Sequence, residues 1–170
     1  MAAIQIANLL GAVPVALTCT SEKRQALLAA GAAHVIATTE QDVQAEVMAL
    51  TNGQGARMAF DPVGGPAVSD ILGALSLQGI FFQYGALDSR DLSVRVMDIL
   101  GKHLTLRGYE LFEISQDPAR LEKAKRFILR GLASGQLRPV IGRVFAFEDI
   151  ALAHDFMESN AQVGKIVVRL

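Results

Sequence analysis

Residues of the types that catalyse reactions or bind metals are few in this sequence, and they are scattered. There is one cysteine, Cys19, and the three histidines are His34, His103 and His154. A catalytic zinc site needs three protein ligands, and a catalytic nucleophile needs a base beside it. The sequence offers neither arrangement, and it has no HExxH, CxxC or Walker A motif. We therefore assign no catalytic residue and no metal ligand, and we interpret the histidines as structural or surface residues.

A glycine-rich loop that could hold phosphate is also hard to find. The segment Gly53-Gln-Gly55 lacks the third glycine of the dinucleotide-binding motif. It also precedes a predicted strand, whereas that motif must follow a strand and open a helix. We interpret the segment as a turn.

Polar and glycine residues do gather where predicted strands end. These strand ends are Leu17–Thr20, Ala37–Thr39, Phe60–Gly64 and Tyr84–Leu87. In open parallel sheets, ligands bind outside the carboxyl ends of the strands. These strand ends are therefore the predicted binding site.

Short apolar strands alternate with helices through the first 85 residues. After an N-terminal helix, the predicted elements are strand 13–17, helix 21–30, strand 34–37, helix 42–50, strand 57–60, a helix from 66 to 79 and strand 80–84. Strands that are apolar throughout and alternate with helices indicate a parallel sheet covered on both faces. Right-handed crossovers make such a sheet doubly wound.

The second half of the chain continues with mixed elements. Residues 88–101 are loop-like or helical, and Leu104–Tyr109 alternates like a strand with one exposed face. Asp117-Pro118 predicts the start of an amphipathic helix that runs to about Ser134. Its polar face carries Arg120, Lys123, Arg126 and Arg130. The last residues predict strand 140–145, helix 147–157 and strand 165–170.

Composition excludes several classes of protein. Of 170 residues, 51% are hydrophobic and 19% are charged, so the chain is not a disordered segment. The net charge of −1 gives no sign of a nucleic-acid partner. No apolar run reaches the ~20 residues that span a membrane, and the apolar start lacks the basic region of a signal peptide. A single cysteine forms no internal disulfide, and we expect a cytoplasmic protein.

Five segments, taken in this order and spacing, resemble a known family. They are AAIQIANLLGA, TSEKRQALLAAGAAHVI, GARMAFDPVGG, LTLRGYELFE and AHDFMESNAQVGKIVVRL. From Ala2 to Leu170 the chain resembles the C-terminal half of a medium-chain dehydrogenase/reductase. It is most similar to the zinc-independent quinone oxidoreductase (zeta-crystallin-like) branch.

The resemblance implies an α/β fold. The expected architecture is a doubly wound parallel, Rossmann-like sheet that lacks its first strand and Gly-rich loop, followed by a C-terminal strand-helix-strand segment. Residues 1–136 are expected to form a partial NADP-binding domain. Residues 137–170 correspond to the segment that completes the catalytic domain in the family.

The resemblance also implies roles at the first strand end. Lys23 matches the basic position that pairs with the adenosine 2′-phosphate of NADPH, and Arg24 could share that role. NAD-specific sites usually carry an acid at the strand tip, and the tip that begins with Thr18 has none. Ser21 lies between this tip and Lys23, and Thr38 stands where many relatives carry a tyrosine. The alternative is that Lys23 is only a solvated side chain at the start of a helix.

The other strand ends match the family's nicotinamide region. Asp61, Val63 and Gly64 correspond to a turn that passes the ribose and nicotinamide, mostly through backbone. The alternative is a turn that simply needs glycines. Gly85 and Ala86 match the backbone that approaches the nicotinamide carboxamide.

The implied activity is hydride transfer from NADPH to a quinone or an α,β-unsaturated carbonyl compound, without zinc. Lys165, in the C-terminal Gly-Lys pair, could reach the cofactor phosphates or be solvated beside a terminal strand. We expect weak or absent NADPH binding and no turnover by this chain alone, because the phosphate loop and the substrate-lining domain lie outside it.

Two alternatives remain. One is a truncated, catalytically inactive remnant that folds and self-associates. The other is a different nucleotide-binding doubly wound protein, such as a methyltransferase, against which the family segments and the missing Gly-rich loop argue. The resemblance further implies a homodimer through the edge strand Leu104–Tyr109, and no nucleic-acid or membrane partner. Loss of the first strand is expected to leave one side of strand 13–17 exposed.

Overall fold

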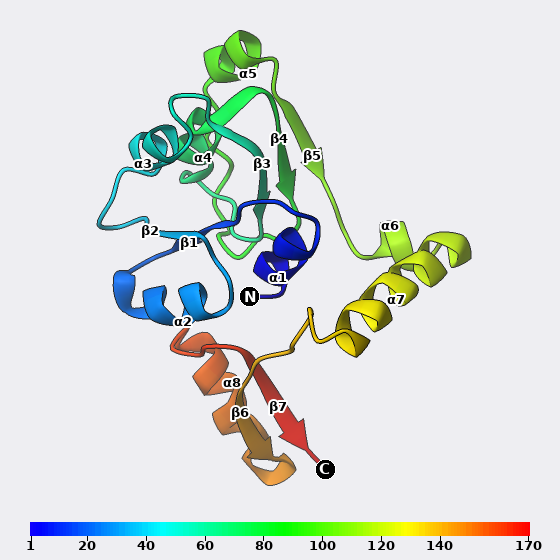
Figure 1. The fold of residues 1–170 in the computed structure, drawn as a ribbon. Helices are drawn as coiled ribbons and strands as arrows, with labels where there is room; N and C mark the ends of the chain where they lie inside the picture. The colour runs from blue at the N-terminus through cyan, green and yellow to red at the C-terminus, as the bar shows by residue number, and fades with distance from the viewer. The chain divides into compact units, whose positions relative to one another are not determined.

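The computed structural model describes residues 1–170. The chain forms two compact units, of which the first combines Met1–Thr39 with Lys125–Leu170 and the second is Glu40–Ala124. Every strand pair is parallel, and helices alternate with strands (Figure 1). The predicted α/β class with a parallel sheet is therefore confirmed. The strands lie in three separate sheets, with the orders β1-β2, β3-β4-β5 and β6-β7.

The first unit contains the N-terminal and C-terminal elements. In chain order they are α1 (Ala2–Leu9), β1 (Val15–Thr18), the 3-10 turn η1 (Ser21–Lys23), α2 (Arg24–Ala29), β2 (His34–Ala37), β6 (Ile141–Ala146), η2 (Phe147–Asp149), α8 (Ile150–Glu158) and β7 (Lys165–Arg169). The helix predicted from Ser21 thus begins as a 3-10 turn. One side of β1 pairs with β2, and its other edge has no partner strand.

A small apolar cluster joins α1 to the β1–β2 pair. Its buried members are Ile4, Ala32 and Val35, and Ala16 and Leu27 pack against them.

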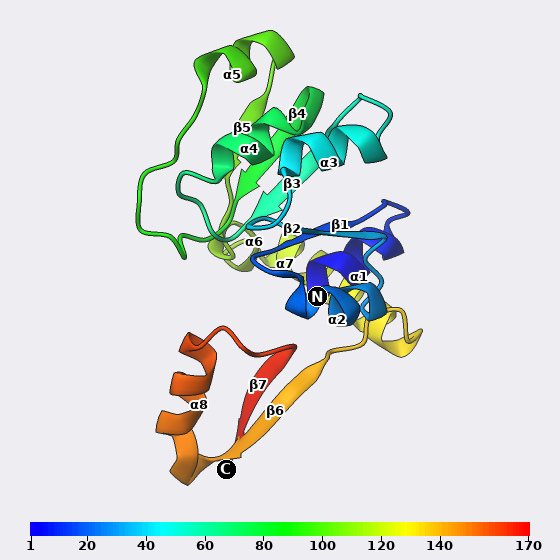
Figure 2. The same ribbon diagram turned by 90° about the vertical axis from the view of Figure 1, so that its left-hand side faces the viewer.

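The second unit holds the three-stranded sheet. Its elements are α3 (Val43–Leu50), β3 (Ala56–Asp61), α4 (Val68–Gly73), β4 (Leu75–Gln83), α5 (Val96–Lys102), β5 (Thr105–Gly108) and α6 (Phe112–Ser115). Figures 1 and 2 show α3 and α4 on one side of this sheet. The core between helices and sheet consists of Val68, Leu72, Leu75, Phe81 and Leu104.

The start of β4 differs from the prediction, which placed Leu75 on a helix and the strand at Ile80. In the structure α4 ends at Gly73, and Leu75 pairs with Ala56 across the sheet. The next pair is Met58 with Ile80, so the ladder is irregular between the two pairs. Polar residues interrupt the apolar pattern in this irregular stretch, so apolar periodicity does not predict the first part of β4.

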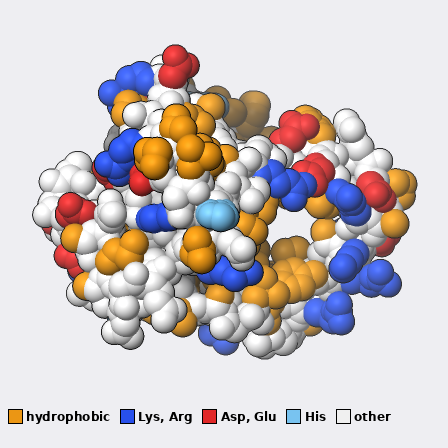
Figure 3. Space-filling model, turned by 90° about the horizontal axis from the view of Figure 1, so that it is seen from above, with side chains coloured by type: hydrophobic (Ala, Val, Ile, Leu, Met, Phe, Trp, Pro, Cys, Tyr) orange, Lys and Arg blue, Asp and Glu red, His pale blue; other side chains and the backbone are white.

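Helix α7 (Pro118–Ala133) begins where the sequence predicts, because Asp117 caps it. The Asp117 Oδ1 accepts hydrogen bonds from the backbone N–H of Ala119 (2.9 Å) and Arg120 (3.2 Å). Lys and Arg side chains gather over this helix (Figure 3). None of the helices combines the length and the apolar character needed to cross a membrane.

Candidate functional site

The predicted site residues fall into two clusters, one in each unit. We call the first the β1–β2 end and the second the β3–β4 end, after the strands whose carboxyl ends carry them. The β1–β2 end consists of Thr18, Ser21, Lys23, Arg24 and Thr38. The β3–β4 end consists of Asp61, Val63, Gly64, Gly85 and Ala86.

Backbone hydrogen bonds hold the two threonines of the β1–β2 end together. The Thr38 N–H donates to the Thr18 carbonyl over 2.8 Å. One residue further on, the Thr39 N–H and Oγ1 both donate to the Cys19 carbonyl, at 3.1 and 2.6 Å. The parallel ladder therefore continues past the last residues of both strands, which fixes the backbone that carries the predicted binding residues.

The two cations of the β1–β2 end already have hydrogen-bond partners. The Lys23 ammonium donates to the backbone carbonyl of Asn160, in the turn between α8 and β7. The Arg24 guanidinium donates to the carbonyl of Val35 over 2.8 Å. An ammonium carries three N–H donors, so Lys23 can keep this bond and still bind an anion. Arg24 is directed back onto β2.

Lys165 belongs to the same unit and lies at the start of β7. Its backbone N–H donates to the Val140 carbonyl over 2.7 Å, and its side chain is exposed. The pKa of the Met1 ammonium is lowered by burial and, secondarily, by the positive charge of Lys165. The Lys165 charge therefore acts at the beginning of α1, where helix N–H groups favour anions.

The β3–β4 end is built mainly from backbone. The Gly64 N–H donates to the buried Asp61 Oδ2 over 2.7 Å, which closes the turn after β3. The turn after β4 runs alongside it, since the Tyr84 N–H donates to the Asp61 carbonyl (2.9 Å) and the Asp88 N–H to the Val63 carbonyl (2.9 Å). The structure thus brings the predicted residues of this cluster together.

Glycine is required at two of these positions. Gly64 has a φ of +80°, which disfavours other residues. A Cβ on Gly85 would lie 2.6 Å from the Pro62 carbonyl oxygen. Backbone conformation accounts for Gly64 and close packing of the two turns accounts for Gly85, with or without a ligand.

Gln83, the last residue of β4, is a site residue that sequence reasoning missed. Its Nε2 donates to the Gly85 carbonyl over 2.6 Å, and its Oε1 is buried with no hydrogen-bond partner. A buried acceptor without a partner is costly unless a donor arrives. The signal was present in the sequence, because Gln83 is the one polar residue within the apolar run IFFQY.

Aromatic rings lie beside the β3–β4 end. Phe60 stacks on Tyr84 with ring centroids 3.9 Å apart, and the Tyr109 ring lies 6.1 Å from Phe60. Phe60 and Tyr84 remain 46% and 39% exposed. Burial, and secondarily the charge of Asp61, raise the pKa of the Tyr84 phenol. The phenol therefore stays protonated and able to donate a hydrogen bond at neutral pH.

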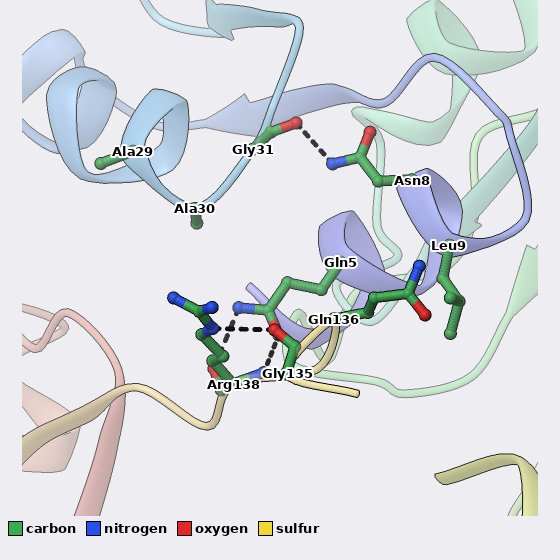
Figure 4. Close-up of a pocket in the computed structure, with 9 residues that line it drawn as sticks. All are labelled: Gln5, Asn8, Leu9, Ala29, Ala30, Gly31, Gly135, Gln136 and Arg138. Atoms are coloured by element: carbon green, nitrogen blue, oxygen red, sulfur yellow. Dashed lines mark hydrogen bonds between the residues drawn. The ribbon is translucent and has the colours of Figure 1, made fainter. Parts of the chain in front are cut away.

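A hollow of about 350 Å³ lies elsewhere in the first unit, among α1, the end of α2 and the segment that follows α7 (Figure 4). None of the predicted site residues lines it. No three His, Cys, Asp or Glu side chains lie close enough together to hold one metal ion.

Comparison with known proteins shows the family to which the chain belongs. Residues 1–130 match the model of the family described as zinc-binding dehydrogenase. The chain is 24% identical over 161 residues to a 2-haloacrylate reductase of Burkholderia sp. This alignment covers 94% of the chain and 48% of that protein. The chain is 26% identical over 175 residues to a highly reducing polyketide synthase of Aspergillus luteorubrus, covering 99% of this chain and 6% of that protein.

Solved structures give the same relationship. A quinone oxidoreductase of Escherichia coli complexed with NADPH superposes with a TM-score of 0.85 and 25% identity, covering 98% of this chain and 52% of that chain. The chain therefore spans about half the length of the reductases that it matches, and only a small part of the polyketide synthase.

Proposed function

Since the chain belongs to the zinc-binding dehydrogenase family, within the medium-chain dehydrogenase/reductase superfamily, we propose that it is the NADPH-binding half of a zinc-independent quinone or enone oxidoreductase. The bound cofactor supplies the hydride, and this chain's residues bind and orient it. In this proposal residues 1–136 bind the cofactor and residues 137–170 complete a catalytic domain. The protein acts in the cytoplasm. Because the chain spans about half of its relatives, we expect weak binding and no turnover by the chain alone.

The observation that carries the proposal is the chemistry of the β1–β2 end. No carboxylate stands at Thr18–Thr20 to hold a ribose hydroxyl, and the Lys23 ammonium has donors to spare. A 2′-phosphate would receive charge-assisted hydrogen bonds from Lys23. Thr18, Ser21 and Thr38 supply hydroxyl groups around it. Arg24 keeps its bond to Val35 and adds positive charge.

The β3–β4 end fits the nicotinamide half of the cofactor. Asp61, Val63 and Gly64, with Gly85 and Ala86, offer mainly backbone groups to a ligand, held by the hydrogen bonds between the two turns. Gln83 supports this backbone from within the protein, through the hydrogen bond from its Nε2 to the Gly85 carbonyl. In the same proposal, Lys165 and the start of α1 contact the cofactor's phosphates.

The acceptor substrate is proposed to be a quinone or an α,β-unsaturated carbonyl compound. One matched relative is a reductase of a haloacrylate, which carries such a double bond, and another is a quinone oxidoreductase. Either proposed acceptor would take the hydride on an electron-poor conjugated system.

Calorimetry with NADPH and NADH tests the cofactor assignment. We expect NADPH to bind more tightly, and Lys23→Met to weaken NADPH binding about tenfold, as the loss of one charge-assisted hydrogen bond predicts, while leaving NADH unchanged. Lys123→Met, on the exposed face of α7, is the matched control. Tighter binding of NADH would overturn the Lys23 assignment. Absence of both would instead favour a folded remnant without a cofactor.

We also propose a homodimer through Leu104–Tyr109. Strand β5 pairs only with β4, so one of its edges can receive a second chain, and Thr105–Gly108 are exposed. Light scattering at tens of micromolar should give twice the mass of 18.2 kDa. Leu106→Pro should give the monomer mass, because it removes a backbone donor from the free edge of β5; Tyr109, which donates to Gln83, and Arg107 by alternation face β4. A wild-type chain that is monomeric at this concentration would contradict the proposal.

A further inference from the structure

One glutamine side chain holds the backbone of a residue 133 positions away. The Gln5 Nε2 donates to the Arg138 carbonyl over 3.0 Å, and the Arg138 N–H donates to the Gln5 Oε1 over 2.8 Å. Figure 4 shows both bonds at one side of the hollow described above. We call this pair of bonds the Gln5–Arg138 clamp.

The clamp copies the pairing of two residues in an antiparallel sheet. There, one extended residue directs its N–H and C=O to the same side and exchanges both bonds with one partner. Arg138 precedes Pro139, which biases Arg138 towards an extended backbone. The primary amide of Gln5 presents a donor and an acceptor with the matching spacing. A single side chain therefore satisfies both backbone groups of Arg138.

Arg138 lies at a junction in the chain. On its N-terminal side, Leu137 is buried against Gly131 of α7, and its N–H donates to the Gly131 carbonyl over 2.9 Å. On its C-terminal side, Pro139 has no N–H, and the Val140 carbonyl already pairs with Lys165 of β7. The chain after Arg138 thus belongs to the strand-helix-strand segment of β6, α8 and β7.

We propose that Gln5 is the positioning residue of a hinge at Arg138, and that its clamp fixes the β6–α8–β7 segment relative to α1. The Lys23 side chain adds one further hydrogen bond to this segment, to the Asn160 carbonyl. The clamp differs from it in having two bonds that hold the backbone of Arg138 directly. This inference goes beyond the proposed function and does not depend on cofactor binding.

Amide exchange and a spin-label distance test the hinge in the full chain. One label is attached to the exposed native Cys19 and the other to Asp155→Cys on α8. Gln5→Met removes both bonds at similar side-chain length. We expect the Arg138 amide to exchange about tenfold faster, because it loses its hydrogen-bond acceptor, and the distance distribution to become at least twofold wider. Gln54→Met, in an exposed turn, is the matched control and should change neither.

Gln5→Glu gives a second variant that keeps part of the clamp. Its carboxylate can still accept from the Arg138 N–H but cannot donate to the Arg138 carbonyl. We expect a broadened distribution with Arg138 exchange between that of the wild type and Gln5→Met. A distribution as narrow as the wild type in both folded variants would overturn the hinge. If Gln5→Met fails to fold, Gln5→Glu alone decides, and an unchanged width in it refutes the proposal.

Discussion

The two strand-end clusters differ in what they are made of. At the β1–β2 end the candidate binding groups are side chains, and the two cations, Lys23 and Arg24, also hold backbone carbonyls of their own unit. At the β3–β4 end the candidate groups are backbone and glycine, locked by Asp61 and by the ladder between two turns. One end is defined by charge, the other by shape.

This difference separates two ways of changing the site. A charge can be exchanged at the β1–β2 end by one surface substitution, because little packing depends on it. A side chain added at Gly85 meets the backbone of Pro62, which cannot move without breaking the hydrogen bond from the Leu87 N–H. We therefore expect substitutions at the first end to change ligand preference, and substitutions at the second to change folding stability.

The largest effect should come from Gly85→Ala. Its new Cβ would lie 2.6 Å from the Pro62 carbonyl oxygen, so the two turns must separate. Overpacking of this kind costs about 2 kcal/mol of the free energy of unfolding, measured by urea denaturation. Gly101→Ala, on α5 and outside the proposed dimer edge, is the matched control, because its Cβ would meet nothing within 4 Å. Equal unfolding midpoints for the two variants would show that the β3–β4 end is not set by shape.

A smaller effect, on ligand preference alone, is expected from Thr20→Asp. The new carboxylate stands at the exposed tip after β1, where it repels a 2′-phosphate and can accept a ribose hydroxyl. We expect the NADPH-to-NADH affinity ratio to fall about tenfold, which is about 1.4 kcal/mol, with the unfolding midpoint unchanged. Ser93→Asp adds the same charge in an exposed loop and should leave the ratio alone. An unchanged ratio for Thr20→Asp would remove the β1–β2 end from the proposed site.

The same contrast explains how much the sequence could predict. The α/β class and the start of α7 followed from local signals, since apolar alternation and the Asp117 cap act over a few residues. The Asp61–Gly65 turn was recognisable for the same reason, because its carboxylate and glycines are neighbours in the chain. Lys23 could be picked out by its charge alone.

Features that depend on distant residues could not be predicted in this way. The bonds of Lys23 to Asn160 and of Gln5 to Arg138 join residues more than 130 positions apart, and no local pattern encodes them. The early start of β4 depends on the pairing of Leu75 with Ala56, which periodicity does not reveal. Whether Gln83 is buried likewise depends on the turn that packs over it.

The smallest effect concerns an exposed charge beside the β3–β4 end. The Arg90 side chain donates to the Asp88 carboxylate from Nε (3.0 Å to Oδ1) and from Nη2 (2.7 Å to Oδ2). The Arg90 backbone N–H also donates to the Asp88 Oδ1, over 3.0 Å. These bonds, the side-chain ones foremost, lower the pKa of Asp88 from 3.8 to about 2. Since the folded pKa is the lower one, the pair stabilises the fold above pH 3.8 and loses this contribution as the pH falls towards 2.

Arg90→Ala removes the side-chain bonds and keeps the backbone one. We expect the Asp88 pKa to return most of the way to 3.8, measured by NMR titration of its carboxyl carbon. Because solvent screens an exposed pair, the unfolding midpoint at pH 7 should not change measurably. Arg57→Ala, an exposed arginine of β3, should leave the Asp88 titration as it is. An Asp88 that already titrates near 3.8 in the unchanged chain would refute the pairing.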